Sequence, residues 1–170
     1  TEGLTPSTLW LAAEVGTNKS AKKHLLQMFP EVSVFDTPKP EQLIYRILSI
    51  ATNPGDLVLD VYLGSGTTAA VAHKMGRRYV GIECGDHVIT HCAKRLQLVI
   101  GGEPGGISKE VGWTGGGGFD FVEVNKIPLD SKRQPIRVSP LDISCYPRKS
   151  RKIGLAATGV QSQTSQAERR

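Results

Sequence analysis

Apolar residues in the first third of the chain recur at helical spacing. They fall on one face over 21–29 and again over 41–51, which predicts two amphipathic helices. Ser20 is expected to cap the first helix, and Pro30 to end it. The continuous apolar run Leu57–Val61 then predicts a short parallel strand covered on both faces.

The next forty residues alternate between strand and helix patterns. A glycine-containing turn precedes an apolar helix over 68–75, and residues 79–83 predict a second strand. Asp86 is expected to cap one further helix, which continues through Val99. Strand, helix, strand and helix in this order predict an open α/β sheet with parallel strands.

After residue 100 the pattern weakens. The alternation over 119–124 predicts one last strand, as an arm of a hairpin whose loop is the glycine run 115–118. Proline, charged and small polar residues dominate from Lys126 onward. Residues 150–170 are therefore predicted to be disordered.

Composition narrows the class of protein. With 39% hydrophobic and 22% charged residues, the 170-residue chain fits a soluble globular protein rather than a disordered one. No apolar run approaches the ~20 residues that span a bilayer, so we expect no membrane partner. The three cysteines include no Cys-x-x-Cys pair, which favours a cytoplasmic location.

The net charge of +5 is unevenly distributed. Residues 1–125 carry a net charge of −2 and residues 126–170 a net charge of +7. A cationic tail can bind a phosphate backbone, but a solvated tail explains the same charge, so charge alone predicts no DNA site. We divide the chain into a linker with a short helix over 1–36, a folded core over 37–125 and a basic tail over 126–170.

The candidate chemistry lies in the turn after the first strand. Gly64 and Gly66 allow the main chain to approach a ligand, and the free N–H groups of the following helix attract a carboxylate or phosphate. Glu83 follows 19 positions after Gly64, at the end of the second strand, where an acid accepts hydrogen bonds from ribose hydroxyls. The pattern predicts a ligand that contains adenosine.

Three interpretations of this turn stay open. Gly64-x-Gly66-x-x-Ala69 satisfies the dinucleotide-binding fingerprint, and a tight turn without a ligand would need the same glycines. Asp60 favours a third, because a carboxylate repels a pyrophosphate but receives an ammonium group. S-adenosylmethionine offers an ammonium group, a carboxylate and a ribose. His87 and His91, four positions apart, have no third metal ligand at suitable spacing and are expected on a solvated face.

The motifs around this turn resemble those of amino-group DNA methyltransferases, which modify exocyclic nitrogens of adenine or cytosine. The run Asp60–Thr68 with Gly81-Ile82-Glu83 looks like their motifs I and II, and Thr37–Ile44 looks like motif X. Val15–Lys23 and Val111–Phe119 are similar to segments of the modification subunits of type III restriction-modification systems, which methylate adenine N6. The resemblance covers roughly residues 8–125.

The resemblance implies a partial Rossmann-like methyltransferase sheet, incomplete in this chain, that binds S-adenosylmethionine. It implies that Asp60 holds the amino group, the turn holds the carboxylate end and Glu83 holds the ribose, with Lys39 near the carboxylate and Leu63 contacting through its main chain. Its partners would be DNA and a restriction subunit. The expected cofactor-binding residues are Lys39, Asp60, Tyr62, Leu63, Gly64, Ser65, Gly66, Thr67, Thr68 and Glu83.

The chain departs from this family in one respect. The catalytic motif is Asp, Asn or Ser followed by Pro-Pro and an aromatic residue, yet none of the ten prolines here is adjacent to another. We therefore assign no catalytic residue and expect an inactive, carboxyl-terminal cofactor half whose sheet has an uncovered edge. The alternatives are a non-catalytic module, either truncated or complementing an amino-terminal half, and a dinucleotide-binding oxidoreductase fragment.

Overall fold

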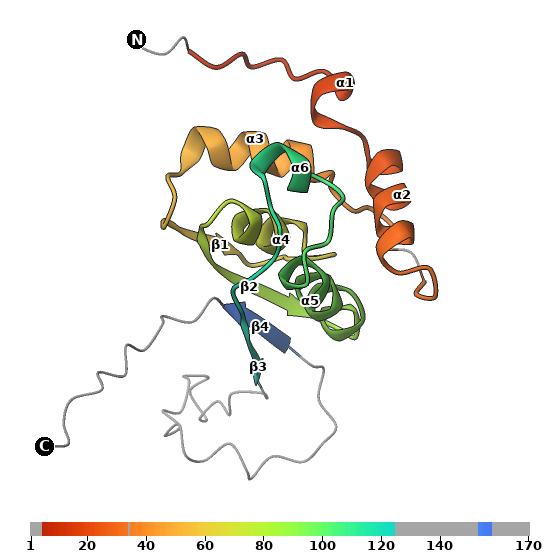
Figure 1. Cartoon of the computed structure of the whole chain (residues 1–170). Coiled ribbons are helices and arrows are strands. Elements are labelled where there is room, and N and C mark those ends of the chain that lie inside the picture. Colours follow the sequence, from red (N-terminus) through yellow and green to blue (C-terminus); the bar gives the residue numbers. More distant parts are fainter. Residues whose placement is uncertain (1–4, 34, 125–152, 158–170) are drawn as a thin grey trace, which may run out of the picture.

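A computed structural model describes residues 5–33, 35–124 and 153–157, and Figure 1 shows the arrangement of their elements. The helices are α1 (Ala12–Val15), α2 (Asn18–Met28), α3 (Glu41–Ala51), α4 (Thr67–Lys74), α5 (Lys94–Ile100) and α6 (Ser108–Val111), with a π-helical segment η1 (Val88–Ala93) directly before α5. The strands are β1 (Leu57–Asp60), β2 (Arg78–Cys84), β3 (Asp120–Val124) and β4 (Ile153–Ala157).

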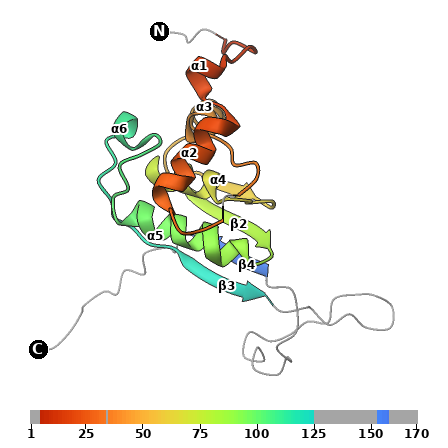
Figure 2. The same ribbon diagram turned by 90° about the vertical axis from the view of Figure 1, so that its right-hand side faces the viewer.

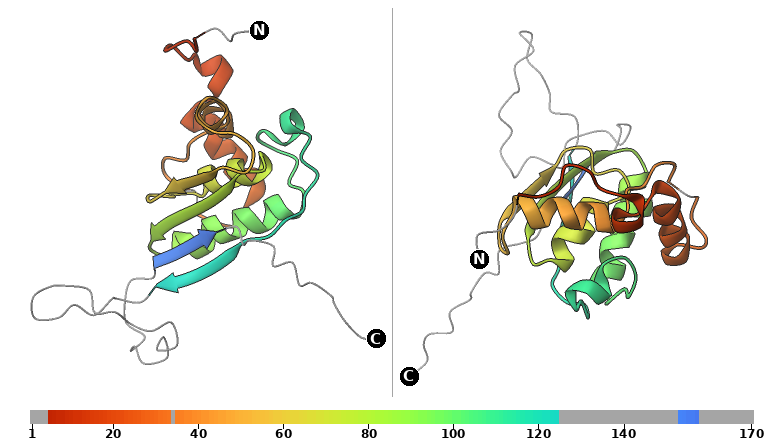
Figure 3. Two further views of the ribbon diagram at one scale, coloured as in Figure 1. Left: turned by 90° about the vertical axis from the view of Figure 1, so that its left-hand side faces the viewer. Right: turned by 90° about the horizontal axis from the view of Figure 1, so that it is seen from above.

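The four strands form one sheet in the order β1-β2-β4-β3. β1 and β2 are parallel, with Asp60 opposite Gly81, and α4 connects them. The predicted strand-helix-strand unit is therefore confirmed. Helices α4 and α5 lie on one face of the sheet (Figure 3), and α1 to α3 gather at the end of the molecule remote from β3 (Figure 2).

Helix α4 forms the centre of the core. Its residues Ala69 to Ala72 have at most 1% of their surface exposed. Small side chains at these positions let the helix lie close to the sheet on one side and to α3 and α5 on the other. The loop before α4 is equally tight, because a Cβ atom on Gly81 would lie 2.6 Å from a methyl carbon of Leu63. Only glycine fits at position 81 without displacing Leu63.

Helix α2 begins earlier than the sequence suggested. Thr17, not Ser20, is its N-cap: the Ser20 main-chain N–H donates to Thr17 Oγ1 at 3.2 Å, and the Thr17 N–H donates to Ser20 Oγ at 2.9 Å. This reciprocal arrangement is a capping box, in which serine serves as the third helical residue. The prediction that Ser20 is the cap was therefore wrong by one turn.

The helix expected from Asp86 through Val99 consists of two parts. Residues 88–93 are π-helical and the α-helix begins only at Lys94. A π-helical turn holds an extra residue and is common beside functional sites. Here it places Cys92 directly against the glycine turn, because the Cα of Cys92 lies 3.1 Å from where a Cβ of Gly66 would be.

Strand β3 pairs differently from the hairpin that the sequence suggested. Its antiparallel neighbour is β4, and β4 also pairs antiparallel with β2. The glycine run is therefore not a hairpin loop, and residues 153–157 are not disordered. The average composition of the tail conceals a five-residue apolar segment, Ile153–Ala157, whose main chain pairs with β2 on one side and with β3 on the other. The remaining predictions for the tail lie outside the described residues.

β1 forms an edge of the sheet and is covered on one face only. Val58 is buried, whereas Leu57 is 55% and Leu59 63% exposed. The prediction of a strand covered on both faces was wrong, because the helices of the described chain pack on a single face of β1. The expected uncovered edge is present among the described residues, where β1 pairs with β2 alone. Within the described part of the chain, every helix is too short or too polar to cross a bilayer.

Candidate functional site

The turn after β1 is folded onto the end of β2. Gly64 and Gly66 adopt φ values of +60° and +80°, the left-handed region that favours glycine. The Leu63 main-chain N–H donates to the carbonyl oxygen of Ile82 at 3.0 Å, and the Gly66 N–H donates to that of Leu63, also at 3.0 Å. Gly66 is the N-cap of α4, so the turn directs the free N–H groups of this helix toward the carboxyl end of the sheet.

Two carboxylates flank this turn. Asp60 ends β1, is half-buried, and its Oδ1 accepts a hydrogen bond from the Tyr62 N–H at 3.0 Å. Glu83 lies near the end of β2 with 9% of its surface exposed. Its Oε2 accepts from the Gly64 N–H at 2.5 Å, and its Oε1 lies 3.2 Å from Nε2 of His87. The structure therefore brings the two predicted acids and the glycine turn together at the carboxyl-terminal ends of β1 and β2.

The other predicted residues divide into exposed and buried groups. Tyr62 is 86% exposed beside the turn, while Leu63 is buried beneath it. Ser65 and Thr67 are buried, with their hydroxyl oxygens 3.2 Å apart, and Thr68 is half-buried. The hydroxyl groups of Ser65 and Thr67 thus already have partners inside the protein.

The segment that resembles motif X meets the turn through its main chain. The Thr67 hydroxyl donates to the carbonyl oxygen of Lys39 at 3.2 Å. The Lys39 side chain is exposed, and its ammonium donates to the carbonyl oxygen of Thr37 at 3.1 Å. The contact between the two motifs therefore involves the backbone of Lys39 rather than its charge.

Arg95 is the principal residue that the sequence analysis missed. The residue is 1% exposed, and its guanidinium donates from Nη1 to Thr67 Oγ1 at 2.9 Å and from Nη2 to Glu41 Oε1 at 2.8 Å. One signal could have revealed it: Arg95 falls three positions after Cys92, on the helical face that also carries Val88 and Val99. A charge on an apolar helical face needs a buried partner.

Arg95 belongs to a network of buried charges. Glu41 also accepts from the Lys74 ammonium at 2.9 Å, and the same ammonium donates to Glu103 at 2.7 Å. Burial alone would raise the pKa of Glu41, but the positive charges of Arg95 and Lys74 lower it. Burial would likewise raise the pKa of Glu103, but hydrogen bonds from His24 and Lys74 and the charge of Lys74 lower it to about 2.

This network resembles a metal site only superficially. His24, Glu41 and Glu103 could each offer a ligand atom within 4.8 Å of the others. The ammonium of Lys74, however, lies among these groups and already bonds both carboxylates. A cation is therefore present as a side chain, and we interpret the cluster as a salt-bridge network.

Cys92 contributes to packing rather than to nucleophilic chemistry. It is buried, and its thiol donates to the carbonyl oxygen of Gly64 at 3.0 Å. Burial, together with the negative charge of Glu83, raises the pKa of the Cys92 thiol to about 12. The thiol is therefore protonated at neutral pH and is a poor nucleophile.

The two histidines do not form the solvated face that the sequence predicted. His91 is 5% exposed, and its Nε2 lies 2.9 Å from the carbonyl oxygen of Ser33. Its ring also packs edge-on against Phe29 and Phe35. His87 lies beside Glu83 instead. The segment before α3 folds back over η1 and covers this face, which periodicity along a single helix could not reveal.

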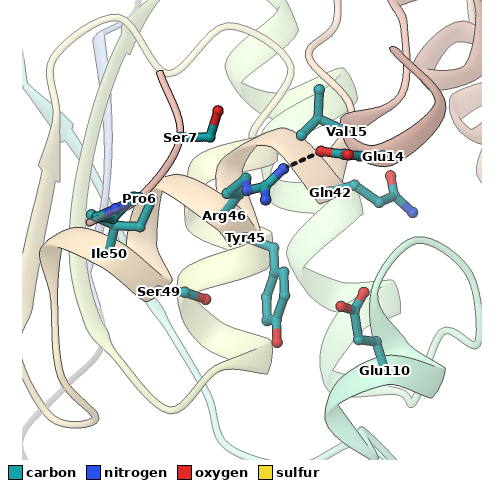
Figure 4. Close-up of a pocket in the computed structure, with 10 residues that line it drawn as sticks. All are labelled: Pro6, Ser7, Glu14, Val15, Gln42, Tyr45, Arg46, Ser49, Ile50 and Glu110. Atoms are coloured by element: carbon teal, nitrogen blue, oxygen red, sulfur yellow. Dashed lines mark hydrogen bonds and ion pairs between the residues drawn. The ribbon is translucent and has the colours of Figure 1, made fainter. Parts of the chain in front are cut away.

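A separate cavity of about 470 Å³ lies between the N-terminal segment, α1, α3 and α6 (Figure 4). Its lining includes Arg46, which pairs with Glu14 at 2.5 Å, and a second acid, Glu110. None of the residues of the glycine turn lines it. The one arginine among its lining residues is therefore already paired with an acid.

A family model described as "DNA methylase" matches residues 1–94. A probable type III restriction-modification enzyme HindVI Mod subunit from Haemophilus influenzae is 54% identical over 96 residues, which are 56% of this chain and 13% of that protein. The type II methyltransferase M1.MboII from Moraxella bovis is 57% identical over 47 residues, which are 28% of this chain and 18% of that protein.

These relatives are much longer than the matched segments. The chain spans less than a fifth of the length of either protein. No solved structure matches it.

Proposed function

Because this chain belongs to the DNA methylase family that the matching model describes, we propose that it forms the S-adenosylmethionine-binding part of a DNA methyltransferase. The complete enzyme would act on adenine N6 within a restriction-modification system. The methylase family and the similarity to a type III Mod subunit support this proposal. The choice of adenine N6 rests on the resemblance of flanking segments to type III modification subunits.

One observation carries the proposal: Asp60, Gly64 and Glu83 lie together at the carboxyl-terminal ends of the parallel strands β1 and β2. The half-buried carboxylate of Asp60 would receive the ammonium group of the methionine moiety. The free N–H groups at the start of α4 would receive its carboxylate. Glu83 would accept hydrogen bonds from the ribose hydroxyls. The three groups thus match the three polar ends of this cofactor in charge and hydrogen-bonding capacity.

S-adenosylmethionine supplies an activated methyl group, and the residues of this chain would fix its position. Positioning is a strong catalytic device, because a reacting pair held in line gains the advantage of an intramolecular reaction. No protein nucleophile is needed when an amine attacks the methyl group directly. The protonated thiol of Cys92 agrees with such a mechanism.

A second candidate is a non-catalytic module that complements a chain carrying the catalytic motif. Two observations favour it over an independent enzyme: no two prolines in the sequence are adjacent, and β1 is uncovered along its edge among the described residues. Dinucleotide binding is less well supported, because Asp60 beside the turn would repel a pyrophosphate.

Titration calorimetry with S-adenosylmethionine and with NAD tests the proposal. We expect the purified chain to bind the first and not the second. Asp60→Asn and Glu83→Gln should each weaken binding about tenfold, since each loses a charge-assisted hydrogen bond. Glu110→Gln, which changes an exposed acid on α6, is the matched control and should bind normally. Binding of NAD without any response to S-adenosylmethionine would overturn the assignment.

A further inference from the structure

We propose that Arg95 is a positioning residue for the cofactor. It would hold the start of α4 in the orientation that receives the carboxylate of S-adenosylmethionine, without touching the ligand. The inference rests on the proposed function and adds to it a residue that lies outside the motifs. Its basis is the contact of one buried guanidinium with both segments that would enclose the methionine end.

The first contact is with the turn itself. Arg95 donates from Nη1 to Thr67 Oγ1 at 2.9 Å and reaches the carbonyl oxygen of Ser65 at 3.4 Å. Thr67 is the first residue of α4, and Ser65 precedes its N-cap. Arg95 therefore binds the backbone of the turn and the side chain at the start of the helix, on the side that faces the protein interior.

The second contact is with the segment that resembles motif X. Arg95 Nη2 bonds Glu41 Oε1 at 2.8 Å, and Glu41 is the first residue of α3. The same Thr67 hydroxyl that accepts from Arg95 donates to the carbonyl oxygen of Lys39. Arg95, Thr67 and the segment 39–41 thus form a closed set of hydrogen bonds behind the turn.

Burial makes this arrangement rigid. Arg95 and Glu41 are each 1% exposed, so neither charge can exchange its partner for water. Glu41 is held in addition by the Lys74 ammonium and by the Ile107 N–H at 3.1 Å. Because Glu41 is held in this way, it fixes the orientation of the Arg95 guanidinium through Nη2. The Nη1 group of Arg95 can then hold the turn in place.

The glycine turn leaves room for this side chain. A Cβ on Gly66 would lie 3.6 Å from Arg95 Cδ and 3.1 Å from Cys92 Cα. The π-helical segment η1 brings Cys92 to this place and directs Arg95, one turn later, beneath the start of α4. Gly66 therefore packs against both η1 and the side chain of Arg95.

Arg95 and Glu83 meet the turn at different places. Arg95 contacts Ser65 and Thr67 at the start of α4, which would hold the methionine end. Glu83 on β2, which would hold the ribose, bonds the turn at Gly64 instead. Loss of the Arg95 contact should weaken binding of a ligand with an amino-acid end more than binding of a ligand without one. 5′-Methylthioadenosine keeps the adenosine and lacks the amino acid, so it separates the two contributions.

The test compares these two ligands on Arg95→Lys and Thr67→Val by titration calorimetry. Lysine can keep the ion pair with Glu41, but its single ammonium group replaces the two nitrogens, Nη1 and Nη2, with which arginine bonds Thr67 and Glu41 at once. We expect S-adenosylmethionine to bind about tenfold more weakly to each variant, with a change below about twofold for 5′-methylthioadenosine. Thr67→Ser keeps the hydroxyl and should restore normal binding of both ligands.

The double variant tests whether Arg95 acts through Thr67. If it does, Arg95→Lys in the Thr67→Val background should cause little further loss, because the contact is already gone. Additive losses, equal weakening of both ligands, or unchanged binding of S-adenosylmethionine to Arg95→Lys would overturn the inference. If Arg95→Lys does not fold, the Thr67 variants decide the question by the same ligand comparison. Failure of the unaltered chain to bind S-adenosylmethionine would instead overturn the proposed function.

Discussion

Gly66 shows how one residue supports both the fold and the site. Its backbone is in the left-handed region at φ +80°, and its missing side chain leaves the space that Cys92 approaches. A side chain at this position would therefore meet two separate penalties. One is the backbone strain of an L-residue with positive φ, and the other is a steric overlap with the main chain of η1.

We predict that Gly66→Ala lowers the free energy of unfolding more than Gly76→Ala does. Gly76 has a similar φ of +69°, and a Cβ there would meet no atom within 4 Å. Gly76→Ala should cost about 1–2 kcal/mol from strain alone, and Gly66→Ala about 1–3 kcal/mol more from overpacking. Urea unfolding measures both values, and equal losses would show that the contact with Cys92 is unimportant.

Several elements of this fold are joined through charge as well as through apolar packing. Lys74 at the end of α4 bonds Glu41 at the start of α3, and it also bonds Glu103 in the loop after α5. Each of these contacts joins elements that are about thirty residues apart in the sequence. The relative placement of α3, α4 and the loop therefore depends on the ionisation of two carboxylates.

We predict that the chain loses stability in acid, between about pH 4.5 and pH 2. The pKa of Glu103 falls from 4.5 to about 2 on folding, so its stabilising effect is complete above the unfolded value and is lost as the pH falls through the folded one. The lowered pKa of Glu41 acts in the same direction. Thermal unfolding midpoints recorded from pH 2 to pH 7 measure the effect.

The variant Glu103→Gln provides the control for this acid transition. Glutamine cannot ionise, so the midpoint should be lower at neutral pH and change less steeply below pH 4.5. Glu110→Gln, at an exposed position, should leave the pH profile unchanged. A Glu103→Gln profile parallel to that of the unaltered chain would show that Glu103 does not contribute to the transition.

At the scale of the whole molecule, the sheet is covered unevenly. Helices cover one face of β1 and β2 (Figure 3). Leu57 and Leu59 of β1 are more than half exposed. An unpaired edge strand that also exposes apolar side chains favours association with another strand or another protein segment. This arrangement agrees with the proposal that the chain is part of a larger methyltransferase.

We predict that the chain alone binds S-adenosylmethionine but does not methylate DNA. Activity should appear when it is combined with the upstream part of a related Mod subunit that carries the catalytic motif. Leu59→Lys should prevent this complementation by placing a charge in the joined sheet, while cofactor binding stays unchanged. Transfer of tritiated methyl groups to DNA is the measurement.

Either of two results would contradict this prediction. Methylation by the chain alone would show that it is a complete enzyme. Full complementation by Leu59→Lys would show that the exposed face of β1 is not where the other part docks. Lys109→Ala, on the exposed side of α6, serves as the matched surface variant and should complement normally.

The sequence by itself determined the local features of this protein. The apolar run before Asp60, the two glycines and the spacing to Glu83 were sufficient to predict a strand, a turn, a helix and a parallel second strand. These features are local because strand, turn and helix preferences act over a few neighbouring residues. The motifs indicated the methyltransferase family for the same reason, since they lie in these short segments.

Only the tertiary structure decided which distant residues meet. The burial of Arg95 and Lys74 depends on partners about thirty to fifty residues away, and the pairing of β4 with β2 depends on a free strand edge that no local pattern describes. The π-helical form of 88–93, which lies against Gly66 at Cys92, was likewise not predicted from the local pattern. A charged side chain favours water unless a fixed opposite charge lies within reach, and only the folded chain provides one.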